Sequence, residues 1–133
     1  MSVFADTSGL YAVFDRDDAN HVRAKAAWAE WLNKEETLLT NNYVLLEMAA
    51  LLQNRIGLAA VRALHEDVVP LLHVDWVTED QHRAGMETVL TASRRKLGLV
   101  DCVSFQTMRK HGVRTAFCFD AHFREQGFEM RPR

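Results

Sequence analysis

The feature that most constrains the fold is the alternation of short, continuously apolar runs with longer segments of helical period. A strand with apolar residues on both faces is typical of a parallel sheet that helices cover on both sides. The chain therefore predicts an α/β fold, a three-layer α/β/α sandwich around a mostly parallel sheet of four to five strands. The expected strands are "SVFA" at 2–5, "TLLT" at 37–40, "LLHVDWV" at 71–77, "RTAFCF" at 114–119 and, as a short edge strand, the tail "FEMRPR" at 128–133.

Segments with helical period separate these strands. Asn41 and Asn42 are candidate N-caps for the third of them, Pro70 is expected to end the fourth, and Gly98 separates the last two. The chain has 133 residues, only 2 prolines and no repeat, so residues 1–133 are expected to form a single domain. The expected helices are 8–15, 21–34, 41–57, 58–69, 79–94 and 100–111.

Charge and hydropathy exclude some classes of protein. No apolar run approaches the ~18 residues of a membrane span, so we expect no membrane contact and a cytoplasmic location. The net charge of −2 does not indicate a nucleic-acid binder by itself, although a basic cluster stands at Arg94, Arg95 and Lys96. Cys102 and Cys118 lie in apolar contexts without metal-binding spacing, and we expect both to be reduced core residues.

Two aspartates stand at the ends of expected strands. In a parallel sheet, ligands bind beyond the carboxyl ends of the strands. Asp6 closes the run "VFA" and Asp120 closes "AFCF". Each could instead cap the helix that follows it.

Two further acids are surrounded by apolar residues. Glu47 is expected to point into the protein, because its helical neighbours are apolar. Asp101 lies within "LGLVDCVSF", in the first turn of a helix. Burial of an unpaired carboxylate costs several kcal/mol. No Lys or Arg lies one turn from Glu47, so a structural salt bridge would need a partner from elsewhere in the fold. The neighbours of Glu47 are Tyr43, Val44, Ala50 and Leu51.

Convergence of the four acids on a cation explains all of them at once. A set of carboxylate ligands without histidine or thiolate suits Mg²⁺ or Mn²⁺. Such clusters hydrolyse phosphodiester bonds, because the ion activates a water and stabilises charge on the phosphate. The sequence therefore predicts a nuclease.

Four segments resemble the motifs of the PIN domain, and within that family the VapC-type toxin ribonucleases of bacterial toxin–antitoxin systems. They are "ADTSGLYAVFDRDDANH", "TNNYVLLEMAALLQNRIG", "LGLVDCVSFQTMRKHGV" and "AFCFDAHFREQGF". The resemblance implies that Asp6, Glu47, Asp101 and Asp120 ligate Mg²⁺ or Mn²⁺ directly or through water, with Ser8 as an auxiliary hydroxyl. It also implies an RNA substrate, a cognate antitoxin as partner, and a homodimer.

Contacts with substrate are less defined. The cluster 94–96 precedes the Asp101 motif and is a candidate for binding the RNA backbone. His122 could contact phosphate, but a lone histidine of this kind is more often structural, and Ser8 could simply cap the first helix. The six histidines lack the spacing of a catalytic or zinc motif, and none is assigned catalysis. The sequence departs from many relatives at Val100, which usually is Ser or Thr, and at Ala121, which usually is Arg.

Other functions remain open at this point. A non-toxin PIN nuclease of RNA processing would carry the same acids. A phosphatase of the haloacid-dehalogenase type needs a second aspartate two residues after its first, where Ser8 stands. A PIN scaffold used only for binding would be expected to have lost an acid. The aromatic group of Trp28 and Trp31, with Tyr11, Phe14 and Leu32, could form a groove for an antitoxin segment, but we favour a place in the core.

Overall fold

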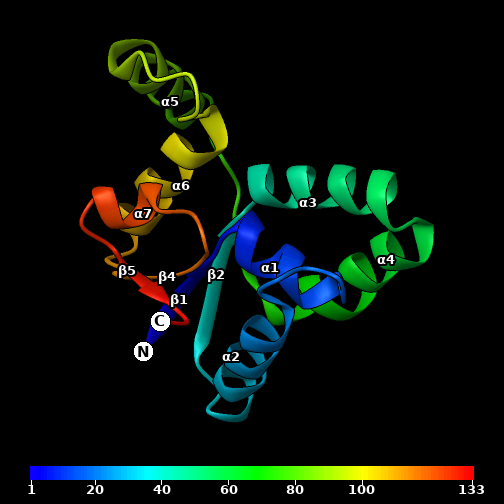
Figure 1. The fold of residues 1–133 in the computed structure, drawn as a ribbon. Coiled ribbons are helices and arrows are strands. Elements are labelled where there is room, and N and C mark those ends of the chain that lie inside the picture. The colour runs from blue at the N-terminus through cyan, green and yellow to red at the C-terminus, as the bar shows by residue number, and fades with distance from the viewer.

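The computed structural model describes all of residues 1–133 and has a five-stranded sheet between helices (Figure 1). The strand order is β3-β2-β1-β4-β5 and every pairing is parallel. The predicted α/β class, the parallel sheet and the five strands are confirmed. The strands are β1 (Ser2–Ala5), β2 (Thr37–Asn41), β3 (His73–Asp75), β4 (Thr115–Phe117) and β5 (Glu129–Arg131).

The helices cover both faces of this sheet. Most of them match the predicted segments, and Asn41 caps α3 by accepting a hydrogen bond from the Val44 N–H at 2.9 Å. The short helix α7, which follows β4, was not predicted. The helices are α1 (Thr7–Phe14), α2 (His21–Asn33), α3 (Asn42–Arg55), α4 (Leu58–Ala63), α5 (Glu79–Ala92), α6 (Leu99–Lys110) and α7 (His122–Glu125).

The prediction of one helix over 58–69 is wrong. The α-helix ends at Ala63, and the chain continues as a π-helical turn, Leu64–Val68, and a 3₁₀ turn, Val69–Leu71. Pro70 explains the change, because proline donates no backbone N–H and its ring collides with the carbonyl four residues earlier. The α-helix therefore widens into a π-helical turn before the proline and narrows into a 3₁₀ turn around it.

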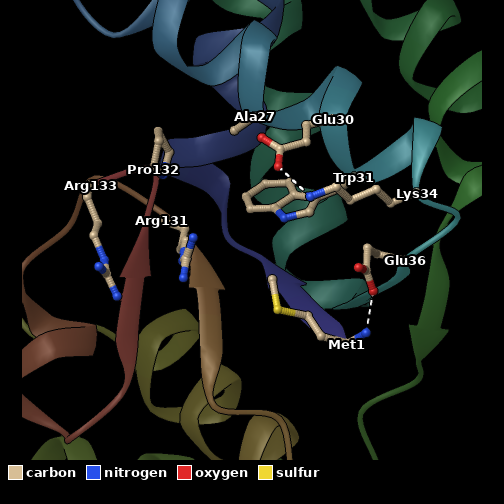
Figure 2. Close-up of a pocket in the computed structure, with 9 residues that line it drawn as sticks. All are labelled: Met1, Ala27, Glu30, Trp31, Lys34, Glu36, Arg131, Pro132 and Arg133. Atoms are coloured by element: carbon tan, nitrogen blue, oxygen red, sulfur yellow. Dashed lines mark hydrogen bonds and ion pairs between the residues drawn. The ribbon is translucent and has the colours of Figure 1, made fainter.

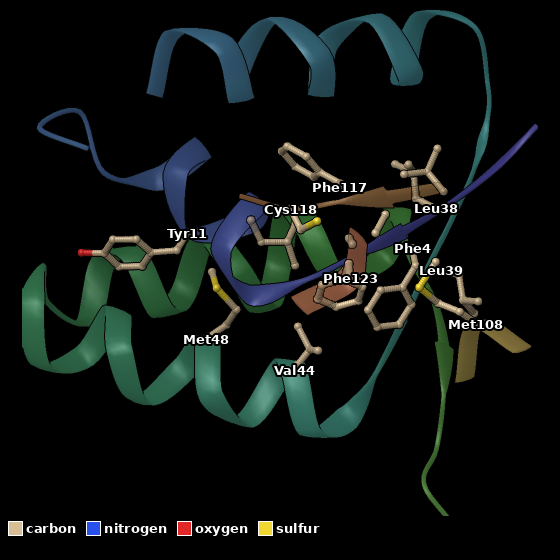
Figure 3. Close-up of a cluster of buried hydrophobic side chains, with 14 of the residues drawn as sticks. Phe4, Tyr11, Leu38, Leu39, Val44, Met48, Met108, Phe117, Cys118 and Phe123 are labelled. Atoms are coloured by element: carbon tan, nitrogen blue, oxygen red, sulfur yellow. The ribbon is translucent and has the colours of Figure 1, made fainter. Parts of the chain in front are cut away.

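The core lies on both faces of the sheet (Figure 3). On one face, the rings of Trp28 and Trp31 from α2 lie 6.2 and 5.0 Å from that of Phe117. On the other face, Phe4 of β1 lies 6.2 Å from Phe123, ring centre to ring centre. Both tryptophans are buried, so the preference for a core role over a groove agrees with the structure.

Helix α5 projects away from the sheet and packs mainly on α6 (Figure 1). No helix is both long enough and apolar enough to span a membrane. The carboxyl ends of β2, β1 and β4 lie side by side in the middle of the sheet, which brings the residues that follow them to a common edge.

Candidate metal centre

Asp6 directly follows β1 and is the most buried of the four acids, with 4% of the residue exposed. Its side chain caps α1, because Oδ2 accepts hydrogen bonds from the backbone N–H of Ser8 at 3.2 Å and from Ser8 Oγ at 2.8 Å. Burial raises the pKa of Asp6 to about 7, the Ser8 hydroxyl opposes that rise, and the charge of Asp101 adds to it. Asp6 thus caps a helix and is also a carboxyl group whose ionisation is disfavoured by burial.

Ser8 links two of the segments that carry the site. Its hydroxyl donates to Asp6 and accepts a hydrogen bond from the backbone N–H of Phe119 at 2.9 Å. Strand β4 ends at Phe117, two residues before this contact, and not at 119 as predicted. Ser8 does not cap α1, since Asp6 has that role. It fixes the position of Asp6 relative to the segment that leads to Asp120.

Glu47 lies on α3 and is less buried than the prediction that it points into the protein implies. The buried stripe of this helix is Val44, Met48 and Leu52, whereas Leu46, next to Glu47, is 72% exposed. Glu47 is half-buried at the edge of that stripe. The prediction relied on the apolar neighbours of Glu47 in the helix. Of these, Val44 is buried, but Ala50 is exposed. The carboxylate instead lines a cavity at the surface.

Asp101 and Asp120 approach each other from α6 and from the loop after β4. The side chain of Asp101 is 18% exposed and that of Asp120 is 34% exposed. Burial raises the pKa of Asp101, and the nearby charge of Asp120 raises it further, while His122 opposes the rise. Asp120 does not close a strand as predicted, but its Oδ1 accepts the backbone N–H of His122 at 2.9 Å.

All four acids line one cavity of about 380 Å³ at the carboxyl edge of the sheet. None of them forms an ion pair with a Lys or Arg side chain. The other lining residues are Thr7, Ser8, Tyr11, Asp18, Asn20, Leu51, Arg55 and Phe119. The cavity therefore gathers negative charge without neutralising it, which a divalent cation could do.

His122 belongs to this group, contrary to the expectation of a cluster without histidine. Its Nδ1 lies 3.1 Å from Asp120 Oδ1 and 3.4 Å from Asp101 Oδ2. The ligand atoms of the three residues all lie within 4.8 Å of one another. The sequence "DAHF" contained this signal. Only Ala121 separates Asp120 from His122, so a tight turn can bring their side chains together.

Arg55 was missed by the sequence reasoning. It is the only Lys or Arg that lines the cavity, and its guanidinium carbon lies 5.3 Å from the centre of the Tyr11 ring. The available signal was helical spacing, because Arg55 follows Glu47 by eight residues on α3 and so lies on the same face. The predicted basic cluster 94–96 does not line the cavity, and Arg94 pairs with Glu125 at 2.8 Å.

A second cavity, of about 370 Å³, lies between α2 and the last strand (Figure 2). Its charged groups are paired. Glu30 accepts from Lys34 at 2.8 Å, the amino group of Met1 pairs with Glu36, and two arginines pair with Glu129. The lining residues are Met1, Ala27, Glu30, Trp31, Lys34, Glu36, Arg131, Pro132 and Arg133.

Comparison with known proteins finds relatives over nearly the whole chain. A sequence model of the PIN domain matches residues 3–129. The 23S rRNA-specific endonuclease VapC20 of Mycobacterium tuberculosis, from strains CDC 1551 / Oshkosh and ATCC 25618 / H37Rv, is 37% identical over 132 residues, which is 98% of each chain. The crystal structure of M. tuberculosis VapC20, described as a sarcin–ricin-loop-cleaving toxin, aligns with a TM-score of 0.84 and 34% identity over 95% of both chains.

Proposed function

Because the chain belongs to the PIN-domain family, we propose that it is a divalent-metal-dependent endoribonuclease, a VapC-type toxin neutralised by a cognate antitoxin. The observation that carries the proposal is the convergence of Asp6, Glu47, Asp101 and Asp120 on one cavity where no Lys or Arg pairs with them. Membership of this family sets aside the haloacid-dehalogenase reading. A role limited to binding would not require all four acids.

The donor set fits a divalent ion. Carboxylate oxygens from four positions are the ligands that Mg²⁺ and Mn²⁺ take, and both ions keep waters for exchange with phosphate oxygens. The buried Nδ1 of His122 has no hydrogen-bond partner, which leaves it free to face a ligand. We therefore propose the four acids as the residues that hold Mg²⁺ or Mn²⁺. When bound, the ion would activate a water and stabilise charge on the scissile phosphate.

The protein residues orient the acids for this chemistry. Ser8 holds the Asp6 carboxylate through its hydroxyl and its backbone N–H, and the turn at His122 holds Asp120. In this scheme the attacking group is the water that the ion activates, and not a ribose hydroxyl. We therefore expect hydrolysis by water, and products that end in 2′,3′-cyclic phosphate would contradict that expectation.

The proposed substrate is a structured loop of the large ribosomal RNA, the sarcin–ricin loop. This assignment is supported by the likeness to VapC20, a 23S rRNA-specific endonuclease whose crystal structure is described as that of a sarcin–ricin-loop-cleaving toxin. Arg55 would contact a backbone phosphate next to the cleaved bond, because phosphate needs a cation and Arg55 is the one that lines the cavity. Its stack on Tyr11 holds the guanidinium at the rim. Arg94, Arg95 and Lys96 remain candidates only for more distant phosphates.

The decisive experiment is cleavage of purified ribosomes and naked ribosomal RNA by the purified protein. We expect a single major cut in the large-subunit RNA with Mg²⁺ or Mn²⁺, and none in EDTA. Sequencing of the 5′ ends of the products locates the cut. Cleavage in chelator would contradict the metal mechanism, whereas metal-dependent cuts scattered over many RNAs would contradict only the substrate.

The toxin assignment has a separate test in cells. Expression of the chain alone should slow growth, and co-expression with a small protein encoded beside it should restore growth. Normal growth with intact nuclease activity in the extract would overturn the toxin role and leave the nuclease role standing. The non-toxin nuclease of RNA processing would then be favoured.

A homodimer is also proposed, and exposed apolar side chains on α3 and α5 support it. Leu46 and Leu90 are each 72% exposed, and an apolar hollow of about 500 Å³ lies beside Leu46. Apolar surface of this kind marks protein interfaces. Light scattering after size exclusion should give the mass of a dimer, and Leu46→Glu with Leu90→Glu should give a folded monomer. A wild-type monomer at micromolar concentration would contradict the proposal.

A further inference from the structure

The side chain of His122 is held among the acids without forming a hydrogen bond of its own. Its Nδ1 is buried, yet neither Asp101 nor Asp120 offers an oxygen in hydrogen-bond geometry, despite separations of 3.4 and 3.1 Å. The backbone fixes this arrangement, because the His122 N–H donates to Asp120 Oδ1 at 2.9 Å. Three potential ligand atoms thus face one small space.

Two other histidines show what a structural role looks like in this chain. Nδ1 of His21 lies 2.7 Å from the carbonyl oxygen of Ala12, in hydrogen-bond geometry, and Nδ1 of His82 is bonded to the Tyr43 hydroxyl. A histidine that only bridged two aspartates as an imidazolium would be expected to aim its N–H at one of them. His122 does not. The ligand atoms of His122, Asp101 and Asp120 instead lie within 4.8 Å of one another, close enough to bind one ion.

We propose that Nδ1 of His122 ligates the same divalent ion as Asp101 and Asp120, so that the centre selects transition ions such as Mn²⁺ and Co²⁺ over Mg²⁺. The inference rests on the proposed metal-dependent function and adds to it a ligand and a preference. Mg²⁺ is a hard ion that takes oxygen ligands and gains little from an imidazole. First-row transition ions accept imidazole nitrogen readily, with an affinity that rises from Mn²⁺ to Co²⁺.

Pulsed electron paramagnetic resonance of the Mn²⁺-loaded protein tests the ligand directly. A bound imidazole gives the spin-echo decay a modulation from directly coordinated ¹⁴N. We expect that signal in wild type, its loss in His122→Ala and its retention in His65→Ala, a matched change at an exposed histidine outside the cavity. Bound Mn²⁺ without ¹⁴N modulation in wild type would overturn the proposal.

Metal titration by calorimetry tests the preference, independently of activity. His122→Ala should weaken Mn²⁺ binding by at least about tenfold and Mg²⁺ binding by much less. His122→Asp, which makes the set all-oxygen, should restore Mg²⁺ binding without restoring the preference for Mn²⁺. Equal losses for both ions in His122→Ala would overturn the proposal. Circular dichroism of each variant establishes that it is folded.

The outcomes separate this inference from the proposed function. If wild type binds neither Mn²⁺ nor Mg²⁺ and cleaves RNA in chelator, both fail. If wild type cleaves RNA only with metal but prefers Mg²⁺ and shows no ¹⁴N modulation, the nuclease proposal stands and the role of His122 fails. Metal-dependent cleavage with ¹⁴N modulation that disappears in His122→Ala supports both.

Discussion

Two cavities of nearly equal size differ in whether the charged side chains that line them form ion pairs. The cavity beneath α2, of about 370 Å³, matches each of its charged groups with a partner of opposite sign (Figure 2). The cavity at the carboxyl edge of the sheet, of about 380 Å³, gathers Asp18 and the four predicted acids, and no Lys or Arg pairs with any of the five. Volume therefore does not distinguish a functional cavity here, but the balance of charge does.

The difference has an energetic consequence. Charges that are paired and hydrated near the surface need nothing further from the protein. Acids that are crowded and partly dry resist ionisation, and burial raises the pKa of Asp6 to about 7 for this reason. A chain that keeps such a group without a counter-charge retains it at a cost in stability. A cation bound from outside the chain would offset that cost, because it would supply the missing opposite charge.

The largest expected effect is on catalysis. Asp101→Asn should lower the rate of RNA cleavage by at least about a hundredfold, because it removes a proposed metal ligand while keeping the shape of the side chain. Initial rates on an RNA containing the cleavage site, with saturating Mn²⁺, measure the loss. The control variant is Glu30→Gln, in the cavity beneath α2, where the charges are paired. This variant should cleave at the wild-type rate. Comparable losses in the two variants would erase the proposed distinction between the cavities.

Much of the fold could be predicted because apolar periodicity and local breakers determine it. The run "SVFA" and the Asn41 cap of α3 are local features, and the structure places both where they were expected. Helix α7 was missed because four residues carry too little periodicity to be detected. The end of β4 was placed two residues too late, and the N–H of Phe119 bonds instead to Ser8, 111 residues away in sequence, which no local pattern indicates.

The acids of the site were predictable individually, but their environments were not. Asp6 was expected at the end of a strand, without a prediction of its burial, and is the most buried of the four. Glu47 was expected to point inward and is only half-buried. Periodicity tells which residues share a helix face, but the packing of α3 against its neighbours decides how much of that face is covered. The spacing of Arg55 from Glu47 and of His122 from Asp120 was visible in the sequence, but these local patterns do not show that acids from other segments come to lie beside the two residues.

The second prediction concerns the stability of the metal-free protein. The pKa of Asp6 is raised from 3.8 to about 7, so the folded state binds this proton more tightly than the unfolded state. Wild-type stability should therefore fall as pH rises from about 4 to about 7. Asp6→Asn removes that loss and still caps α1, since Asn is as good a cap as Asp. The variant should gain up to about 4 kcal/mol at pH 7 and only about 0.5 kcal/mol at pH 4.

Urea unfolding in EDTA at several pH values measures this difference. Mn²⁺ should stabilise wild type at pH 7, by an amount set by the ratio of its concentration to its dissociation constant, and should stabilise Asp6→Asn less. The same direction is expected for Asp101→Asn, because the pKa of Asp101 is also raised. Marked destabilisation of both variants in EDTA would mean that these aspartates hold the fold together.

The third prediction concerns the single cation of the acid cavity. Arg55→Ala should raise the KM for RNA by about tenfold with a smaller effect on kcat, since a phosphate contact contributes to binding and orientation. Arg55→Lys should recover part of the loss. Arg62→Ala is the matched control, because Arg62 pairs with Glu66 on the surface and does not line the cavity. A fall in kcat alone would argue against a contact with substrate.

The smallest effect should come from neutralising the paired cavity, and its sign should be opposite to that of Asp6→Asn. The Lys34 ammonium donates a hydrogen bond to Glu30 and lowers the pKa of that carboxyl, so Glu30 stabilises the fold above its unfolded pKa and loses this effect as pH falls. Glu30→Gln should therefore lower the melting temperature slightly at pH 7, and the difference from wild type should vanish near pH 3. Salt should shrink it, because both side chains are exposed. If Glu30→Gln instead stabilised the protein in the manner of Asp6→Asn, charge pairing would not be what separates the two cavities.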